Sequence, residues 1–158
     1  NLGAKIVSRI ENTEKLLKKL NLKKVHKDMY YEKSFNLGIP QVNLDKLKDK
    51  IFGIENNLDE LGGIDFKKGC YIGQENTSRI KLRNKLRKRI LPVKKMSGEI
   101  FENDIIKYKD IEIGKIMIAK PYAFAFVKVI DPDINEFANI DLTCGVAKVK
   151  ILKPDWIE

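Results

Sequence analysis

The sequence predicts an α+β protein in which helical segments come first and a small antiparallel β-barrel follows. In the first half, apolar residues recur at helical spacing, and glycine and proline separate the segments. After Leu86 the apolar residues alternate with polar ones, which is the period of β-strands. Five or six short strands in about seventy residues favour a closed barrel over an open sheet. We therefore expect a domain boundary near residues 82–86, between residues 1–83 and 84–158.

Helical periodicity accounts for most of the first half. The expected elements are a strand at residues 4–8, helices at residues 12–20, 23–37 and 43–47, and another helix that begins near Gly73. Gly38 and Pro40 end the helix at 23–37. His26 falls on the apolar side of that helix, with no Cys, Asp or Glu at ligand spacing, so we expect a structural histidine. Residues 64–66 fit either a strand or an extended loop.

Alternating apolar residues predict the strands of the second half. The expected strands are residues 106–108, 111–113, 116–118, 122–130 and 147–151. Turns are expected at Lys109–Asp110 and at Gly114, and residues 131–133 stop the fourth strand. That strand is apolar on both faces, as a central strand would be. Its aromatic residues, Tyr122, Phe124 and Phe126, are expected in the barrel core rather than on a base-stacking surface.

The composition bounds the class of protein and its partners. The chain has 158 residues, of which 43% are hydrophobic and 34% charged, as in globular proteins. Its formal net charge of +9 favours anionic partners. Two cysteines are too few for a disulfide framework or a zinc site, which indicates a reducing compartment, and we expect the cytoplasm. No apolar run is long enough for a bilayer, and the N-terminus, without a Met or a targeting pattern, resembles a cut end.

The densest group of chemically active residues surrounds Cys70. Two lysines precede it, and a helix is expected to begin about one turn later; both features lower the pKa of a thiol. Such a thiol suits a metal ligand, a nucleophile or a redox-sensitive group. Gly69 and Gly73 allow a positive φ or a close approach of the backbone to a ligand. From the residues alone, a small buried cysteine between two turn glycines is an equally good interpretation. Cys144, at a strand turn, is expected to be inert.

A run of eight residues makes the assignment more specific. The sequence KGCYIGQE at residues 68–75, followed by Arg79, resembles the diagnostic motif of the YgfZ-type proteins, which are folate-binding relatives of the glycine cleavage T protein, an aminomethyltransferase. Four flanking segments also fit this family: residues 38–40 (GIP), the acidic residues 55–61, the basic residues 85–89, and residues 154–156 (PDW). The resemblance covers essentially the whole chain but only the later half of a family member.

The resemblance implies a fold and a set of site residues. Residues 1–83 would form the C-terminal part of a T-protein-like folate-binding domain, and residues 84–158 the barrel domain. Cys70 matches the functionally required cysteine of the family, which acts in cluster handling or redox chemistry. The residues that match the motif around it, and that we expect at the cofactor, are Lys68, Tyr71, Gly73, Gln74, Glu75 and Arg79. The implied cofactor is tetrahydrofolate, in a site that this chain completes only in part, and no metal site is expected.

Three classes of function remain in view. The first is a folate-binding accessory protein in iron–sulfur cluster assembly or repair, a role that the family also links to tRNA modification. The alternative is a tetrahydrofolate-dependent aminomethyltransferase, but Asn36 stands where that branch carries a folate-contacting Glu, two residues before Gly38. Ser34 likewise replaces an Arg that relatives often carry. An RNA-binding module rests only on the net charge and on basic residues at every second position, for which a solvated strand is the simpler interpretation. These residues are Lys81, Arg83, Lys85, Arg87 and Arg89.

The expected partners follow from the first of these functions. We expect folate, and either iron–sulfur assembly proteins or the cluster-dependent enzymes that they serve. We expect neither nucleic acid nor a membrane, and we expect a monomer. Whether the protein is itself an enzyme stays open, because it is aminomethyltransferase-like but lacks the pattern of a classical methyltransferase.

Overall fold

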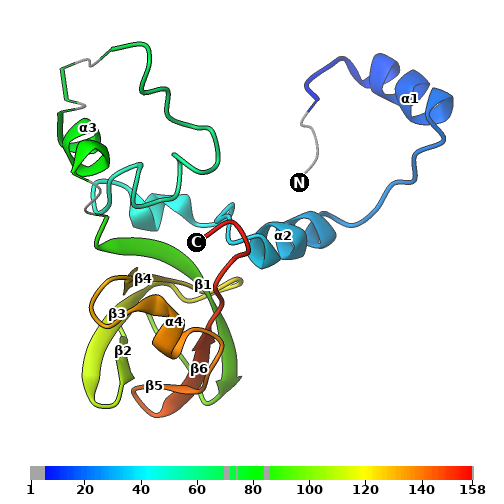
Figure 1. Ribbon diagram of the computed structural model, residues 1–158. Helices are drawn as coiled ribbons and strands as arrows, with labels where there is room; N and C mark the ends of the chain where they lie inside the picture. The colour runs from blue at the N-terminus through cyan, green and yellow to red at the C-terminus, as the bar shows by residue number, and fades with distance from the viewer. Residues whose placement is uncertain (1–5, 70–71, 74, 84–85, 158) are drawn as a thin grey trace.

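The chain is described by a computed structural model that covers residues 6–69, 72–73, 75–83 and 86–157. Figure 1 shows a compact barrel below a more open arrangement of helices and loops. The helices are α1 (Ile10–Lys19), α2 (Lys27–Asn36), the 3-10 helix η1 (Leu44–Leu47), α3 (Glu75–Leu82) and α4 (Ile134–Phe137). The strands are β1 (Lys88–Ser97), β2 (Ile105–Tyr108), β3 (Ile111–Ile118), β4 (Phe124–Lys128), β5 (Leu142–Cys144) and β6 (Ala147–Ile151).

The six strands close into the antiparallel barrel that the sequence predicts. Their order is β1-β4-β3-β2-β5-β6, and the ring closes because β1 pairs with β4 through its first half and with β6 through its second half. A closed ring leaves no sheet edge open to pairing with another chain. The mixed α and β composition and the barrel are therefore confirmed.

Alternation along each strand fills the barrel interior with aliphatic side chains. Ala125 and Val127 of β4 point inward and are fully buried, in one cluster with Leu91 of the neighbouring β1 and Ile106 of β2. The short helix α4, which the sequence analysis did not predict, adds the fully buried Phe137 to the same cluster. The interior thus consists of side chains from the second half of the chain alone.

The aromatic residues of β4 lie on the opposite face from the one expected. Because Ala125 and Val127 point inward, Phe124 and Phe126 must point outward. There they join a second apolar cluster beneath the first half of the chain. This cluster consists of Leu47, Ile90, Met117, Ile118 and Phe124, with Phe35, Ile51, Tyr122 and Phe126 half-buried against it. The strand is covered on both faces as predicted, but its aromatic side chains attach the helical segment to the barrel instead of filling the barrel.

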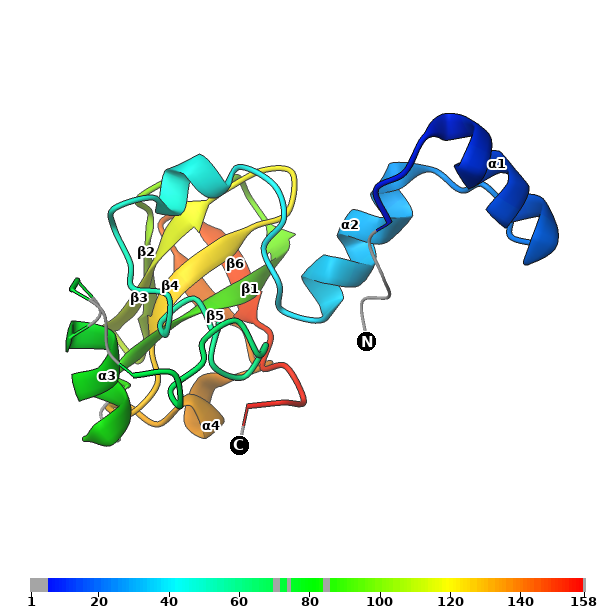
Figure 2. The same ribbon diagram turned by 90° about the horizontal axis from the view of Figure 1, so that it is seen from above.

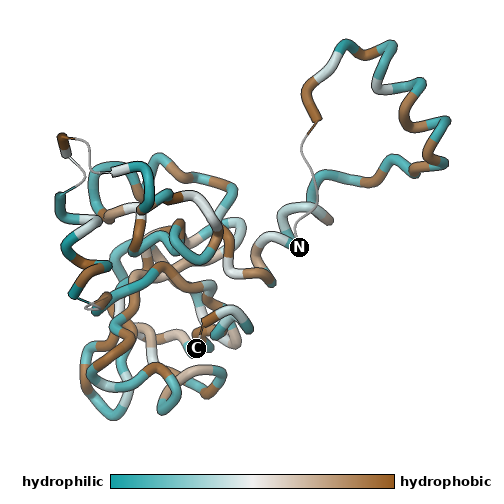
Figure 3. The backbone as a smooth tube through the Cα atoms, turned by 45° about the horizontal axis from the view of Figure 1, so that its top comes forward, coloured by the Kyte–Doolittle hydropathy of each residue, from teal (hydrophilic) through white to brown (hydrophobic). Residues whose placement is uncertain are grey.

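The first two helices extend away from the barrel (Figure 2). Helix α1 buries none of its residues, and Figure 3 shows polar and apolar stretches mixed along it. The strand expected at 4–8 is wrong for the part that the structure describes, because residues 6–9 are exposed and outside any strand. The place expected for His26, on the apolar side of the helix, is also wrong, although its role is structural. His26 is exposed and caps α2, where its side chain accepts a hydrogen bond from the Asp28 N–H, and the helix therefore begins at Lys27 and not at Lys23.

Two flanking motif segments meet where α2 ends. Gly38 has a φ of +74° and ends the helix as predicted. A Cβ at this position would overlap the ring of Pro154, and the Trp156 Nε1–H donates to the Leu37 carbonyl at 2.9 Å. Ser34 is buried, and its hydroxyl donates to the Ile39 carbonyl. The GIP and PDW segments are therefore packed against each other.

Glycine at position 114 has a different role from the one expected. The hairpin turn at Lys109–Asp110 is confirmed, with φ values of +47° and +63°. Gly114, in contrast, lies inside β3 opposite Val127, and the strand continues through it. A Cβ there would come within 2.9 Å of the Phe126 carbonyl oxygen. Close approach of two strands, and not a turn, requires glycine at this point.

Candidate functional site

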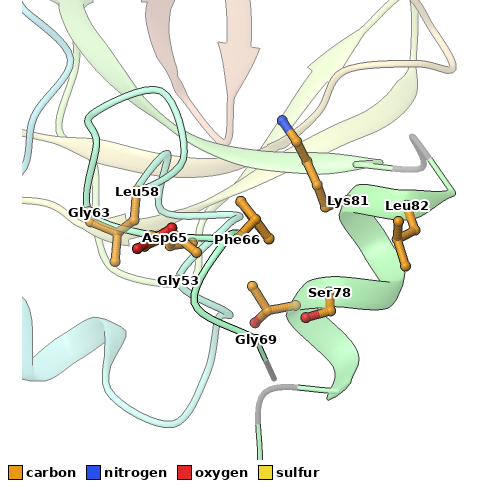
Figure 4. A pocket seen from close by; sticks show the side chains of 11 residues that line it. Gly53, Leu58, Gly63, Asp65, Phe66, Gly69, Ser78, Lys81 and Leu82 are labelled. Carbon is orange, nitrogen blue, oxygen red and sulfur yellow. The ribbon is translucent and has the colours of Figure 1, made fainter. Parts of the chain in front are cut away.

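A cleft of about 500 Å³ lies between the loop at residues 53–69 and helix α3 (Figure 4). Its lining is more apolar than polar, and Leu58 and Phe66 come from the loop. Helix α3 supplies one face of four residues: Thr77, Ser78, Lys81 and Leu82. Both the size and the mixed lining are those of a small-molecule site.

Backbone hydrogen bonds and turns give the loop its shape. The Gly63 N–H donates to the Leu58 carbonyl at 2.6 Å, and Asp65 accepts from the Lys67 N–H at 2.8 Å. Residues 64–66 form no strand, so the extended loop is the correct one of the two alternatives. Gly69, the last described residue before Cys70, lines the cleft with a φ of +91°.

The acidic segment 55–61 fastens this loop to the barrel. Asn57 is fully buried; its side-chain amide donates to the Ile90 carbonyl at 2.7 Å and its Oδ1 accepts from Arg89 at 3.1 Å. The Ile90 N–H donates to the Glu55 carbonyl at 2.9 Å, and Arg89 also forms an ion pair with Glu60. One wall of the cleft is therefore fixed to β1 by buried polar contacts.

Lys81 ties the opposite wall to the same loop. Its Nζ forms an ion pair with Asp59 and lies 5.6 Å from the centroid of the Phe66 ring. Lys81 belongs to α3 and Arg89 to β1, so the alternating basic residues do not follow one strand edge. The regular spacing in the sequence does not place these side chains in one row, because α3 ends and β1 begins within the run. Lys81 and Arg89 instead hold the two walls of the cleft.

Among the described motif residues, Gly69 lines this cleft, and the others are not part of its lining. Gly73 has a φ of +89°, and its N–H donates to the Glu75 carboxylate at 2.9 Å. Lys68 and Arg79 are exposed. The remaining predicted residues, Cys70, Tyr71 and Gln74, lie outside the described residues.

The local charge is mixed rather than uniformly positive. Lys67 and Lys68 are exposed before the motif cysteine, as expected. Glu75, however, is the first residue of α3, and its carboxylate accepts from the Gly73 N–H just before the helix. A carboxylate here competes with any other anion for the helix start. The two lysines are therefore the stronger electropositive contribution to this turn.

Cys144 has the environment of an inert thiol, in agreement with the prediction. It ends β5 and is fully buried. Burial, with a smaller contribution from Asp104, raises the pKa of Cys144 to about 11. At neutral pH this thiol is protonated and out of reach of solvent.

Other groups add little to the site. Among the residues that the structure describes, no three His, Cys, Asp or Glu side chains gather as a metal site would require. None of the described helices is long and apolar enough to cross a membrane. The sequence analysis missed Phe66, Thr77, Ser78 and Leu82 as cleft residues. Helical spacing of positions 77, 78, 81 and 82 indicates that these four residues share one face of α3, but nothing in the sequence brings Phe66 to them.

Comparison with known proteins supports the family resemblance. No protein-family model matches the chain. It is 48% identical over 63 residues to the mitochondrial iron–sulfur cluster assembly factor IBA57 homolog of Neurospora crassa, which is 40% of this chain and 14% of the relative. The homolog of Dictyostelium discoideum is 40% identical over 80 residues, which is 51% of this chain and 17% of the relative. The homolog of Pyricularia oryzae is 38% identical over 73 residues, 46% of this chain and 19% of the relative.

These matches correct one expectation and confirm another. The relatives are named as mitochondrial proteins, so the expected cytoplasmic location is wrong. Each match spans less than a fifth of the relative's own length. Folate binding, tRNA modification and the roles of the single motif residues stay predictions. The resemblance drawn from the KGCYIGQE motif is confirmed, and the chain is related to the YgfZ-type iron–sulfur cluster assembly factors.

Proposed function

We propose that this chain acts in mitochondrial iron–sulfur cluster assembly, as an accessory protein whose working thiol is Cys70. The observation that carries the proposal is its identity of 38–48% with assembly factors of several organisms. The cluster is cargo in this proposal and not a resident cofactor. A cluster takes four thiolates in its usual ligand set, so one cysteine here supplies one ligand and the partner protein supplies the others.

The neighbours of Cys70 support this role. Gly69 lines the cleft, and Lys67, Lys68, Ile72 and Gly73 are all exposed. We therefore expect a partner protein to reach the Cys70 thiol, and two lysines directly before a cysteine favour its thiolate form. Cys144 cannot take its place, because it is sealed inside the barrel with a raised pKa.

The cleft beside the motif suits part of a folate molecule. Its volume of about 500 Å³ accommodates a pterin or aminobenzoyl ring, and Phe66 offers an aromatic surface against which such a ring can stack. Lys67 and Lys68 stand in the sequence between Phe66 and Gly69, which line the cleft, and their ammonium groups suit the carboxylates of the glutamate tail. Folate would supply a one-carbon carrier or a binding signal; the residues named here would bind and orient it. Calorimetric titration with tetrahydrofolate tests this part of the proposal.

An aminomethyltransferase activity has less support. Asn36 ends α2 at the position where that branch carries a folate-contacting glutamate. An amide neither holds a negative charge nor accepts a proton at neutral pH, so it cannot replace a carboxylate in orienting a charged substrate. Asp65 does bring a carboxylate to the lining of the cleft, but its Oδ1 already accepts from the Lys67 N–H at 2.8 Å.

The test is replacement of each cysteine in cells that lack the endogenous protein. We expect Cys70→Ser to reduce the activity of cluster-dependent mitochondrial enzymes to the level of the deletion strain. Cys144→Ala is the matched control, because it removes the other thiol and should retain that activity. Thermal unfolding of the purified variants shows whether each still folds. Full enzyme activity in the strain that carries a folded Cys70→Ser variant would contradict the proposal.

A further inference from the structure

A basic groove crosses the outer face of the barrel, away from the cleft. It consists of two adjoining hollows of about 590 Å³ and 490 Å³ that share Lys88 and Lys128. The first hollow is floored by apolar side chains, among them Met117 and Phe126. The residues that define the basic groove are Lys50, Arg87, Lys88, Lys115, Phe126 and Lys128.

Strand register places these residues side by side on one face. Lys88 of β1 is the direct partner of Lys128 of β4, and Lys115 of β3 is the direct partner of Phe126. Like charges directly opposite each other destabilise an antiparallel pair. A barrel that needed only a solvated surface would gain stability from an acidic residue at either position. Lys94 and Lys150 oppose each other in the same way outside the basic groove, but there Lys150 forms an ion pair with Asp141. Lys88 and Lys128 have no such acidic partner among the ion pairs of the described residues, so a ligand explains this pair better than folding does.

The positive charge of the basic groove is not balanced by ion pairs with acidic residues of the described chain. Among the residues that the structure describes, Lys46, Lys81, Lys95, Lys120 and Lys150 form ion pairs, but no lysine of the basic groove does. Two acidic residues, Glu112 and Asp131, also line the hollows. Five cationic residues against these two leave a formal excess of positive charge around an apolar floor.

We propose that the basic groove binds an acidic segment of a partner protein, with carboxylates on the lysines and an apolar side chain on the floor beside Phe126. The lysines around the floor attract carboxylates and steer their approach. Met117 and Phe126 offer apolar surface that a purely charged ligand would leave unused. This inference is independent of the proposed function, because the basic groove shares no residue with the cleft.

A protein segment fits this surface better than single-stranded nucleic acid does. Nucleic-acid grooves stack successive bases on several open aromatic rings. The basic groove has one aromatic ring, Phe126, which can stack a single base but not a succession of bases. Arg87 is its only arginine, so most of its cations are point charges without the planar fork that matches phosphate.

Fluorescence anisotropy with two labelled probes tests the proposal. The first probe is a glutamate-rich peptide with one central leucine, and the second is a single-stranded oligouridylate of equal charge. We expect the peptide to bind more tightly than the oligouridylate, and its binding to weaken as salt is added. Lys88→Glu with Lys128→Glu should weaken peptide binding by about tenfold or more. Lys94→Glu with Lys148→Glu makes the same change of net charge on exposed positions of β1 and β6, and should weaken binding by less than about twofold.

Two further variants separate binding from folding. Lys128→Glu alone places a carboxylate opposite Lys88, so its melting temperature should equal or exceed that of the wild type while peptide binding weakens. Exchanging the leucine of the peptide for serine should weaken binding several-fold, because the apolar floor then has no partner. Equal losses from the groove pair and the control pair would overturn the proposal. So would oligouridylate binding as tight as that of the peptide, or affinity unaffected by the loss of leucine.

Discussion

The barrel and the segment before it are stabilised in different ways. The barrel closes on itself around an aliphatic interior drawn from residues 91–157. Helix α1 buries no residue, and α2 buries only Ser34. Short isolated helices are marginal in water, because most helical stability in proteins comes from tertiary packing. We therefore expect the barrel to be a complete folding unit, and the segment before it to gain its order from the parts that touch the barrel.

Besides the second apolar cluster, several of those contacts lie in the segments that the family resemblance singles out. Trp156 bonds to the end of α2, Asn57 and Glu55 bond to β1, and Arg89 pairs with Glu60. None of these groups lies in a position to react with a ligand in the cleft, since each is occupied by the barrel or by the loop itself. The flanking segments therefore hold the first half of the chain against the barrel. We expect the reactive groups in the KGCYIGQE motif instead.

The largest expected difference between the regions is in the free energy of unfolding. Ile106 is fully buried in the barrel, whereas Ile10 at the start of α1 is 75% exposed. Ile106→Ala removes the same atoms as Ile10→Ala but leaves a cavity, so we expect it to lower the free energy of unfolding by about 2–5 kcal/mol. Ile10→Ala should change it by less than about 0.5 kcal/mol. Urea unfolding followed by the single tryptophan, Trp156, measures both.

Equal losses from the two substitutions would contradict the comparison. That result would mean that α1 is packed in solution against a surface that the described residues do not show. A change in the slope of the urea dependence would instead indicate a change in the surface exposed on unfolding, and the two effects can be separated in the same experiment.

The second difference is in the reactivity of the two cysteines, one in each region. Burial raises the pKa of Cys144 to about 11, so at about pH 8 it holds roughly a hundredfold less thiolate than an ordinary thiol. We expect iodoacetamide to modify Cys70 at least about a hundredfold faster, as measured by mass spectrometry of the native protein. Reactivity of Cys144 should rise only as the pH approaches its raised pKa, because the thiolate forms there. Similar native rates at the two positions would show that Cys70 is also sealed, and would remove its proposed role.

The barrel could be predicted from the sequence to a greater extent than the site could. Period-two alternation is local, so it marked β2, β3, β4 and β6 directly. Strand β1 was not assigned as a strand, because Pro92 interrupts it and lysines dominate its second half. Whether Phe124 points inward or outward depends on which face of β4 lies inside the barrel, and alternation alone leaves both choices open.

The site depends on contacts between distant residues, and this limited its prediction. The KGCYIGQE motif identified the region through family resemblance, but the walls of the cleft come from a loop and a helix that Asp59 and Lys81 join. No periodicity marks such a loop. Likewise, the alternating cations from Lys81 to Arg89 predict a strand edge, whereas a helix ends within the run. Local rules failed where the chain changes from one kind of element to another.

The smallest expected effect concerns the junction between the two regions. Asn57 has a φ of +61° and bonds through its side chain to Ile90 and Arg89. Asn57→Gly keeps this backbone conformation accessible but removes both hydrogen bonds, so we expect a loss of about 1–2 kcal/mol. Asn56→Ala is the matched control, because the Oδ1 of Asn56 is buried without a hydrogen-bond partner, and its removal should be nearly neutral.

Hydrogen exchange shows where that loss falls. If the barrel is complete in itself, Asn57→Gly should speed exchange in the loop at residues 53–69 and leave the amides of β2, β3 and β5 unchanged. Uniform acceleration throughout the barrel would mean that the loop is part of the barrel's cooperative unit, and the distinction between the two regions would fail. Unchanged exchange in the loop would show instead that Glu55, through its carbonyl, and the ion pair of Glu60 hold the wall of the cleft without Asn57.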